Sequence, residues 1–148
     1  MKRLNVVTIQ LIRERMVKYD AERLTSAETA AVICRSFIGD IDREVFVVLH
    51  LDGKNRVQSV TEISKGSLNQ SIVHPREVFK AAILSNSAAV ILCHNHPSGD
   101  CAPSPEDREC TKRLVDAGEM LGIKVLDHII IDTAPDGSFF SFAASGIL

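Results

Sequence analysis

The sequence predicts one α/β domain in which helices pack against a mixed central β-sheet. Its 148 residues are 45% apolar and 24% charged, which is typical of soluble globular proteins and is enough chain for one domain with its own core. Segments with the two-residue period of strands alternate with segments that have the 3.6-residue period of helices. In chain order they predict βαββαβαββ, an alternation that indicates a sheet covered by helices.

Residues 1–24 are predicted to contribute a strand and a connection that packs on the domain formed by residues 25–148. Val7, Ile9 and Leu11 alternate with polar residues, which is the period of a half-buried strand. The basic start of the chain lacks a small-residue cleavage site, so a secretory signal is not expected. No apolar run approaches the roughly 18 residues of a membrane span. We therefore expect a cytoplasmic protein, without a membrane partner, whose four cysteines are reduced thiols.

The first helix is predicted to begin with the capping-box sequence of residues 25–28 and to end at Gly39. Residues 43–49 are rich in β-branched side chains and predict a strand. A turn sequence follows at residues 52–55, and residues 56–64 are expected to complete a β-hairpin.

The second half of the chain is predicted to contain the central strand. After a loop at residues 66–69, Pro75 suits the first turn of a helix that reaches Asn86. Residues 88–93 are apolar on both alternating faces, as in a strand that is covered on both sides. A loop at residues 95–103 and a helix at residues 104–121 are predicted to follow. Two closing strands are predicted at residues 123–132 and 138–142, with a turn at residues 134–137 between them.

The charge balance excludes a strongly basic nucleic-acid binder. The 17 Lys and Arg residues against 19 Asp and Glu give a formal net charge of −2. One Tyr, six Phe and no Trp offer few aromatic platforms on which bases could stack. The composition therefore gives only weak support to DNA as a partner.

Two histidines mark the end of the predicted central strand. His94 and His96 are two residues apart, so in an extended chain both imidazoles project from the same face, about 6.6 Å apart at the backbone. Two imidazoles so placed can bind one metal ion, but the pair alone is a weak signal, and the two residues can instead be loop histidines that hydrogen-bond to nearby backbone. The pair alone leaves both interpretations open.

The sequence after the histidines is compatible with both interpretations. Ser104 is a good helix N-cap and Asp107 complements the helix dipole in the first turn, so capping explains both residues. Asp107 would also lie at the third position of a helix that a short loop connects to His96, where its carboxylate can turn back toward the histidines. A His-His-Asp set would leave a fourth position for water, as in catalytic zinc sites.

These residues resemble a known signature. The pattern His-x-His, seven residues, Ser, two residues, Asp is the JAMM signature of the JAB/MPN metalloprotease family, and it is present at His94, His96, Ser104 and Asp107. The chain is similar to the RadC-like branch of that family at Glu44, residues 52–56, Gly66, Asn69, and residues 74–78, 94–100 and 127–128. The resemblance begins near Thr25 and implies the JAB/MPN fold of the short, single-domain members.

The resemblance also implies a function, namely hydrolysis of a peptide or isopeptide amide bond by a zinc-activated water. His94, His96 and Asp107 would hold one Zn²⁺ per chain, with water in the fourth position. Glu44 would act as the general base, and Ser104 would stabilise the developing oxyanion with its hydroxyl.

Three further residues have competing interpretations. His50 shares a strand face with Glu44 and is either a rival or supporting ligand or a satisfied histidine. His128 is expected to form a structural polar pair with Asp127 rather than to bind metal. Cys101 lies between the candidate ligands in sequence and is expected to be a loop thiol.

Two other functions stay open beside hydrolysis. One is a non-catalytic or accessory role in DNA repair, which the name of RadC-like proteins suggests. The other is an interaction module that keeps the fold without the activity. The sequence identifies neither the peptide or protein substrate nor the oligomeric state, and specificity is expected to depend on loops at residues 66–69 and 100–103.

Overall fold

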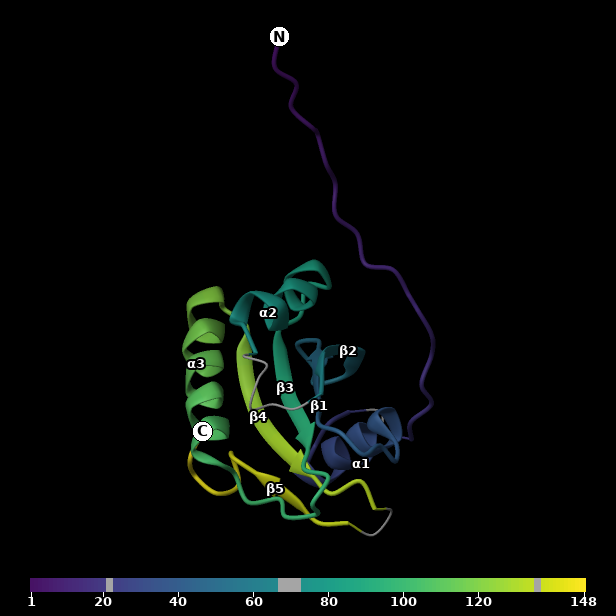
Figure 1. The fold of residues 1–148 in the computed structure, drawn as a ribbon, viewed down its shortest axis with the longest axis vertical. Helices are drawn as coiled ribbons and strands as arrows, with labels where there is room; N and C mark the ends of the chain where they lie inside the picture. Colours follow the sequence, from purple (N-terminus) through teal and green to yellow (C-terminus); the bar gives the residue numbers. More distant parts are fainter. Residues whose placement is uncertain (21–22, 67–72, 135–136) are drawn as a thin grey trace.

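The computed structural model describes residues 1–20, 23–66, 73–134 and 137–148, which form one mixed β-sheet and three helices (Figure 1). In chain order the elements are α1 (Ala27–Ile38), β1 (Val45–Leu51), β2 (Val57–Lys65), α2 (Pro75–Leu84), β3 (Ala89–Asn95), α3 (Pro105–Leu121), β4 (Lys124–Ile131) and β5 (Phe139–Ser141). The strand order is β2-β1-β3-β4-β5, and β3 and β4 are parallel while the other neighbours are antiparallel. The predicted α/β fold class, a mixed sheet flanked by helices, is confirmed.

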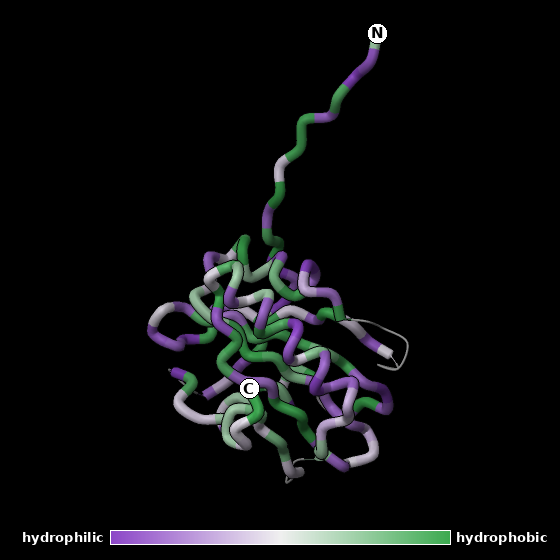
Figure 2. The backbone as a smooth tube through the Cα atoms, turned by 90° about the vertical axis from the view of Figure 1, so that its left-hand side faces the viewer, coloured by the Kyte–Doolittle hydropathy of each residue, from purple (hydrophilic) through white to green (hydrophobic). Residues whose placement is uncertain are grey.

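Helices cover both faces of the sheet (Figure 1). α1 packs on one face, where Val45, Val47 and Leu49 of β1 share its apolar cluster. The alternate side chains Phe46 and Val48 belong to the cluster that α2 and α3 cover on the other face. Because β1 and β3 are buried on both faces, their sequences are continuous apolar runs. Figure 2 shows these apolar stretches in the middle of the domain and hydrophilic segments toward its outside.

The strand predicted at residues 7–11 does not form. Residues 1–20 contain neither helix nor strand, and the side chains of Val7 and Ile9 are exposed. Alternation specifies which face a strand would bury, but a strand also needs a partner edge, and none of the five described strands pairs with this segment. The N-terminal end instead projects away from the domain (Figures 1 and 2).

The chain that follows this segment is attached to the hairpin of β1 and β2. The Tyr19 hydroxyl donates a hydrogen bond to the carbonyl oxygen of Val57 at 3.2 Å. Leu24 is buried, and its N–H donates to the carbonyl oxygen of Asn55 at 2.8 Å. These contacts fix the entry of the chain into α1.

α1 begins one residue later than the capping-box sequence predicts. Ser26, rather than Thr25, is the N-cap, because its side-chain oxygen accepts the N–H of Thr29 at 3.2 Å. The helix ends where predicted, at Gly39, which has φ of 70° and so needs a residue without Cβ strain.

β3 extends beyond its predicted end. A loop was expected from Asn95, but β3 continues through that residue and pairs Asn95 with Ile131 of β4. On its other side His94 pairs with Phe46 of β1. His94 is therefore held inside the sheet by neighbours on both sides, which fixes the position of its side chain.

Two predicted connections lie partly outside the described residues, namely residues 67–69 of the first loop and residues 135–136 of the last turn. The longest described helix, α3, has 17 residues and carries charged side chains along its length. None of the described helices is long and apolar enough to span a membrane.

Candidate metal centre

The two histidines of the predicted pair converge at the end of β3. His94 is fully buried as a strand residue, and His96 follows the strand with its N–H bonded to the carbonyl oxygen of Ile131 at 3.1 Å. Their Nε2 atoms are 3.1 Å apart. The structure therefore brings the two imidazoles together on one side of the sheet, as the spacing predicts.

Asp107 completes the group from the first turn of α3. Its Oδ1 lies 3.2 Å from Nε2 of His94, and its Oδ2 lies 3.2 Å from Nε2 of His96. The same carboxylate accepts the N–H of Ser104 at 2.9 Å, while the Ser104 hydroxyl oxygen accepts the N–H of Asp107 at 3.0 Å. Capping and convergence on the histidines, which the sequence left as alternatives, are both present.

The ring of His96 presents Nε2 in the form that a metal requires. Its Nδ1 lies 2.7 Å from the carbonyl oxygen of Asp100. A carbonyl oxygen only accepts, so Nδ1 carries the proton, and in the neutral ring Nε2 is left with a free lone pair. This is the tautomer that ligates metal through Nε2.

The donor set fits a divalent ion of the zinc type. His94, His96 and Asp107 are the group of the described residues whose ligand atoms lie close enough together to hold a metal ion. Zinc binds imidazole nitrogen and carboxylate oxygen at about 2.0–2.2 Å in tetrahedral geometry, which places ligand atoms about 3.3 Å apart. The observed separations of 3.1 and 3.2 Å are close to that spacing.

The pKa values of His96 and Asp107 depend on each other. Burial acts to raise the pKa of Asp107, but its close contacts with His94 and His96 outweigh that effect and hold the pKa well below its usual range. The hydrogen bond to Asp107 raises the pKa of His96, against an opposing effect of burial. Without a metal, a proton on His96 thus neutralises the carboxylate.

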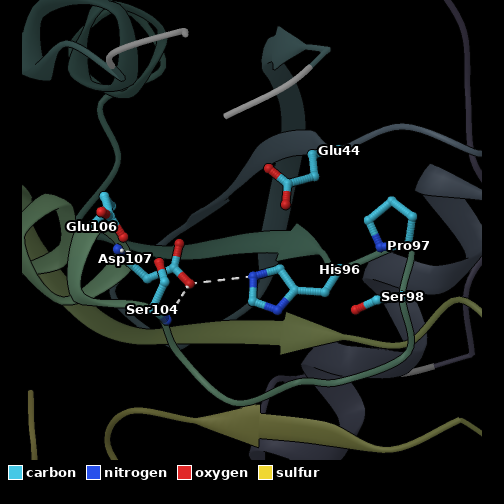
Figure 3. Close-up of a pocket in the computed structure, with 7 residues that line it drawn as sticks. All are labelled: Glu44, His96, Pro97, Ser98, Ser104, Glu106 and Asp107. Carbon is cyan, nitrogen blue, oxygen red and sulfur yellow. Dashed lines mark hydrogen bonds and ion pairs between the residues drawn. The ribbon is translucent and has the colours of Figure 1, made fainter. Parts of the chain in front are cut away.

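A pocket of about 280 Å³ opens beside these ligands (Figure 3). Its lining residues are Glu44, His96, Pro97, Ser98, Ser104, Glu106 and Asp107. Figure 3 shows the Glu44 carboxylate directed into this space, above the His96 ring. Two of the candidate ligands, the candidate base and the candidate oxyanion donor therefore share one pocket.

Glu44 lies immediately before β1, not inside the strand as the sequence indicated. Its carbonyl oxygen accepts the N–H of Gly66 at 2.8 Å, which continues the pairing of β1 with β2 by one residue. The side chain is half-buried at the pocket. Its main chain is thus held in strand-like geometry while its carboxylate reaches the site.

The other singled-out residues lie away from the ligand atoms. His50 is buried in β1 with Nε2 2.9 Å from the Thr61 hydroxyl, so it is a hydrogen-bonded core histidine. The Cys101 thiol lies 3.4 Å from the carbonyl oxygen of Ser138, which agrees with a loop thiol.

The predicted structural polar pair of Asp127 and His128 is present, but it forms through the main chain of His128 and not between the two side chains. Successive residues of a strand point to opposite faces, so the two side chains cannot meet. The Asp127 carboxylate accepts from the main-chain N–H of His128 and from the Ser141 hydroxyl. The His128 ring is instead fully buried, with Nε2 2.8 Å from Nδ1 of His94.

Sequence reasoning missed three residues that support the site. His128 and Thr111 are bonded to each other behind His94, and Asn95 is bonded to the main chain beside Glu44. No spacing rule identifies these residues, because each contact joins segments distant in sequence. A buried polar residue in an apolar strand was the one available signal for His128 and Asn95.

Comparison with known proteins agrees with the geometry. Residues 24–147 match the family model described as the RadC-like JAB domain. The UPF0758 protein of Trichlorobacter lovleyi is 57% identical over 127 residues, which are 86% of this chain and 54% of that protein. That of Geobacter sulfurreducens is 54% identical over 128 residues, 86% of this chain and 55% of the relative. The chain spans about half the length of these curated relatives.

Proposed function

This chain belongs to the RadC-like JAB domain family, and on that premise we propose that it is a zinc-dependent hydrolase of peptide or isopeptide amide bonds. The observation that carries the proposal is the convergence of two Nε2 atoms and one carboxylate, 3.1 to 3.2 Å apart, at the wall of a pocket. Atoms that accept hydrogen bonds lie this close only when a proton or a cation lies between them.

The donor chemistry supports zinc as the ion. Two imidazole nitrogens and one carboxylate oxygen are a common ligand set of catalytic zinc, and three protein ligands leave a position for water. Zinc bound there would lower the pKa of that water to about 7, which makes it a nucleophile at neutral pH.

The position of Glu44 supports a role in proton transfer during hydrolysis. It shares the pocket with His96 and Asp107, so its carboxylate can accept a proton from the attacking water and return it to the leaving amine nitrogen. The amide carbon–nitrogen bond breaks, and the products are a carboxylate and an amine. General acid and base catalysis of this kind contributes about 10²–10⁴ to the rate.

Ser104 has a hydroxyl proton to donate. Its oxygen accepts the N–H of Asp107, and this leaves its own O–H free of that capping role. Because Ser104 lines the same pocket, the O–H can donate to the oxygen that becomes negative in the transition state. Capping and oxyanion stabilisation are therefore compatible in one side chain.

The first experiment measures zinc. Metal analysis of purified protein, and of metal-free protein after titration with zinc, is expected to give one zinc per chain. His96→Ala is expected to lose it, whereas His74→Ala, which alters a histidine at the start of α2 outside the centre, is expected to keep it. Absence of stoichiometric zinc in the wild-type protein, or unchanged zinc in His96→Ala, contradicts the proposal.

The second experiment measures hydrolysis. The probes are a mixture of internally quenched peptides and a dye pair joined through a lysine isopeptide bond. Glu44→Gln is expected to retain zinc and to lose at least a hundredfold in rate. Full activity of Glu44→Gln excludes the role of Glu44, and cleavage that persists in His96→Ala excludes zinc hydrolysis.

A further inference from the structure

We infer that His128 and Thr111 form a buried relay that fixes the tautomer and orientation of the ligand His94. The inference rests on the proposed function, because it concerns how a metal ligand is held. His128 and Thr111 are positioning residues, since neither lines the pocket and neither belongs to the group of candidate ligands, His94, His96 and Asp107.

The relay is a continuous line of short contacts from β3 through β4 to α3. Nδ1 of His94 lies 2.8 Å from Nε2 of His128, and Nδ1 of His128 lies 2.6 Å from the Thr111 hydroxyl oxygen. The Thr111 hydroxyl in turn donates to the carbonyl oxygen of Asp107 at 2.7 Å. All three contacts are between buried groups.

The carbonyl at the end of the line sets the direction of every hydrogen bond. The Asp107 carbonyl oxygen can only accept, so the Thr111 hydroxyl donates its single proton to that oxygen. The Thr111 oxygen must then accept a hydrogen bond from Nδ1 of His128. A neutral His128 ring that is protonated at Nδ1 has an accepting Nε2. His94 must then donate from Nδ1, which leaves its own Nε2 with the free lone pair that a metal requires.

The reverse assignment is unfavourable. If His128 donated from Nε2 as well as from Nδ1, it would be an imidazolium with no exposed surface. Its ring stacks on Phe142 at 4.9 Å between centroids and meets the edge of Phe46 at 5.5 Å. A cation so enclosed would contact the ring of a candidate metal ligand, and its own two hydrogen-bond partners are an imidazole and a hydroxyl, neither of which is negatively charged.

The aromatic surroundings also explain why a relay is needed. Phe46 stacks on His94 at 5.8 Å between centroids, so the rings of His94 and His128 lie against apolar faces. At the Nδ1 position of His94, where a ligating histidine ordinarily meets a carboxylate, a carbonyl oxygen or water, the structure has the ring of His128. His128 is consequently the group that supplies the acceptor for Nδ1 of His94.

The relay links two ligands of the centre to each other. It starts on the ring of His94 and ends on the main chain of Asp107, one turn before Thr111 in α3. A displacement of Thr111 would therefore affect both ligands. A purely structural polar cluster would stabilise the fold to the same degree but would impose no particular tautomer on His94.

The test compares two threonine–histidine pairs. Thr111→Val removes the hydroxyl but keeps the shape, Thr111→Ser keeps the hydroxyl, and Thr61→Val removes the matching hydroxyl beside His50, outside the centre. Zinc affinity is measured by competition with a chromogenic chelator. Thr111→Val is expected to weaken zinc binding about 10–100-fold, while the other two variants stay within about threefold of the wild type.

Equal zinc affinity of Thr111→Val and the wild type overturns the relay. A loss of the same size in Thr111→Ser does so too, because the serine retains the hydrogen-bonding group. A wild-type protein that binds no zinc contradicts the proposed function instead, so the two failures are distinguishable.

A second measurement needs no variant. Long-range proton–nitrogen NMR correlations report which ring nitrogen of each histidine is protonated. In the metal-free wild-type protein His128 is expected to be neutral and protonated at Nδ1, and zinc is expected to leave that pattern unchanged. A His128 protonated at Nε2 in the zinc-loaded protein reverses the deduced direction and overturns the inference.

Discussion

Asn95 holds the main chain on both sides of Glu44. Its Oδ1 accepts the N–H of Val45 at 2.7 Å, and its Nδ2 donates to the carbonyl oxygen of Arg43 at 3.0 Å. Asn95 is fully buried and lies between the two histidines of the centre in sequence. The segment that carries two candidate ligands is thereby bonded directly to the segment that carries the candidate base.

Replacement of Asn95 is expected to separate catalysis from metal binding. Asn95→Ala leaves the buried N–H of Val45 without a partner, which costs about 1–3 kcal/mol of stability, and frees the main chain beside Glu44. We expect at least a tenfold fall in kcat with zinc stoichiometry unchanged. Val48→Ala, a cavity variant in the neighbouring strand β1, controls for lost stability and should keep its kcat. Equal kcat for Asn95→Ala and the wild type would show that Glu44 needs no such support.

Zinc affinity is expected to fall as the pH falls. The hydrogen bond to Asp107 raises the pKa of His96 above its ordinary 6.5, and the ring must lose its proton before Nε2 can bind zinc. The effect of the His96 proton on zinc affinity is therefore absent above that raised pKa. Below it, zinc affinity declines about tenfold per pH unit, while Asp107 stays ionised. Calorimetry in buffers of different ionisation enthalpy should register proton uptake by the buffer on zinc binding below the raised pKa. An affinity that does not change between about pH 5 and pH 8 contradicts this expectation.

In the metal-free protein, the contribution of His96 to folding stability should decrease as the pH rises, which is opposite to the pH dependence of zinc affinity. A histidine whose pKa is higher in the folded state stabilises the fold below its unfolded pKa, and this contribution is lost as the pH rises through the folded value. His96→Ala is therefore expected to flatten the urea-unfolding profile of the metal-free protein on the alkaline side of pH 6.5. If the slope of the two proteins is the same there, the ion pair of His96 with Asp107 contributes nothing to folding.

His50 is expected to make the fold sensitive to acid. It is fully buried, its Nδ1 has no hydrogen-bond partner among the described residues, and burial lowers its pKa to about 4. The unfolded chain binds a proton near pH 6.5, so stability falls between about pH 6.5 and pH 4, by up to about 3 kcal/mol. His50→Phe should lose less stability over this range than the wild type in urea unfolding. Val48→Ala, which leaves His50 intact, should keep the wild-type slope.

Arg35 is expected to stabilise the main chain just after β4 and just before β5 through carbonyl oxygens. From α1 its guanidinium donates to the carbonyl oxygens of Asp132, Gly137 and Ser138. Arg35→Lys keeps the charge but not the planar fork, and should cost about 1–3 kcal/mol of unfolding free energy. Arg43→Ala, which removes an exposed ion pair, should cost less than about 0.5 kcal/mol. A similar cost for both variants would show that the carbonyl contacts are not specific to the guanidinium.

The fold could be predicted from the sequence because its signals are local. Apolar runs such as residues 88–93 identify strands buried on both faces, and Ser104 and Gly122 delimit α3 as predicted. The N-terminal strand was wrong for a complementary reason. Alternation is a local pattern, but a strand must also pair with the edge of a sheet. Only the three-dimensional structure shows that none of the described strands pairs with residues 7–11.

The convergence of His94, His96 and Asp107 could be predicted for the same reason, since the three residues lie within fourteen residues of sequence, and their role as metal ligands stays a proposal. The roles of Glu44 and Ser104 stay predictions that their positions in the pocket support. The supporting contacts of His128 and Thr111 could not be predicted. They depend on the register of β3 against β4, which no short-range pattern of residues specifies.

If the proposed centre binds zinc, the reciprocal capping of α3 by Ser104 and Asp107 would make the first turn of that helix a reporter of metal occupancy. The carboxylate that would ligate the ion is the same one that protects the N–H of Ser104, so fraying of this turn and release of the ion are one linked equilibrium. Amide hydrogen exchange at Ser104 and Asp107 should therefore slow in proportion to zinc occupancy. Exchange in the middle of α1, which contributes no ligand, should follow only the global stability.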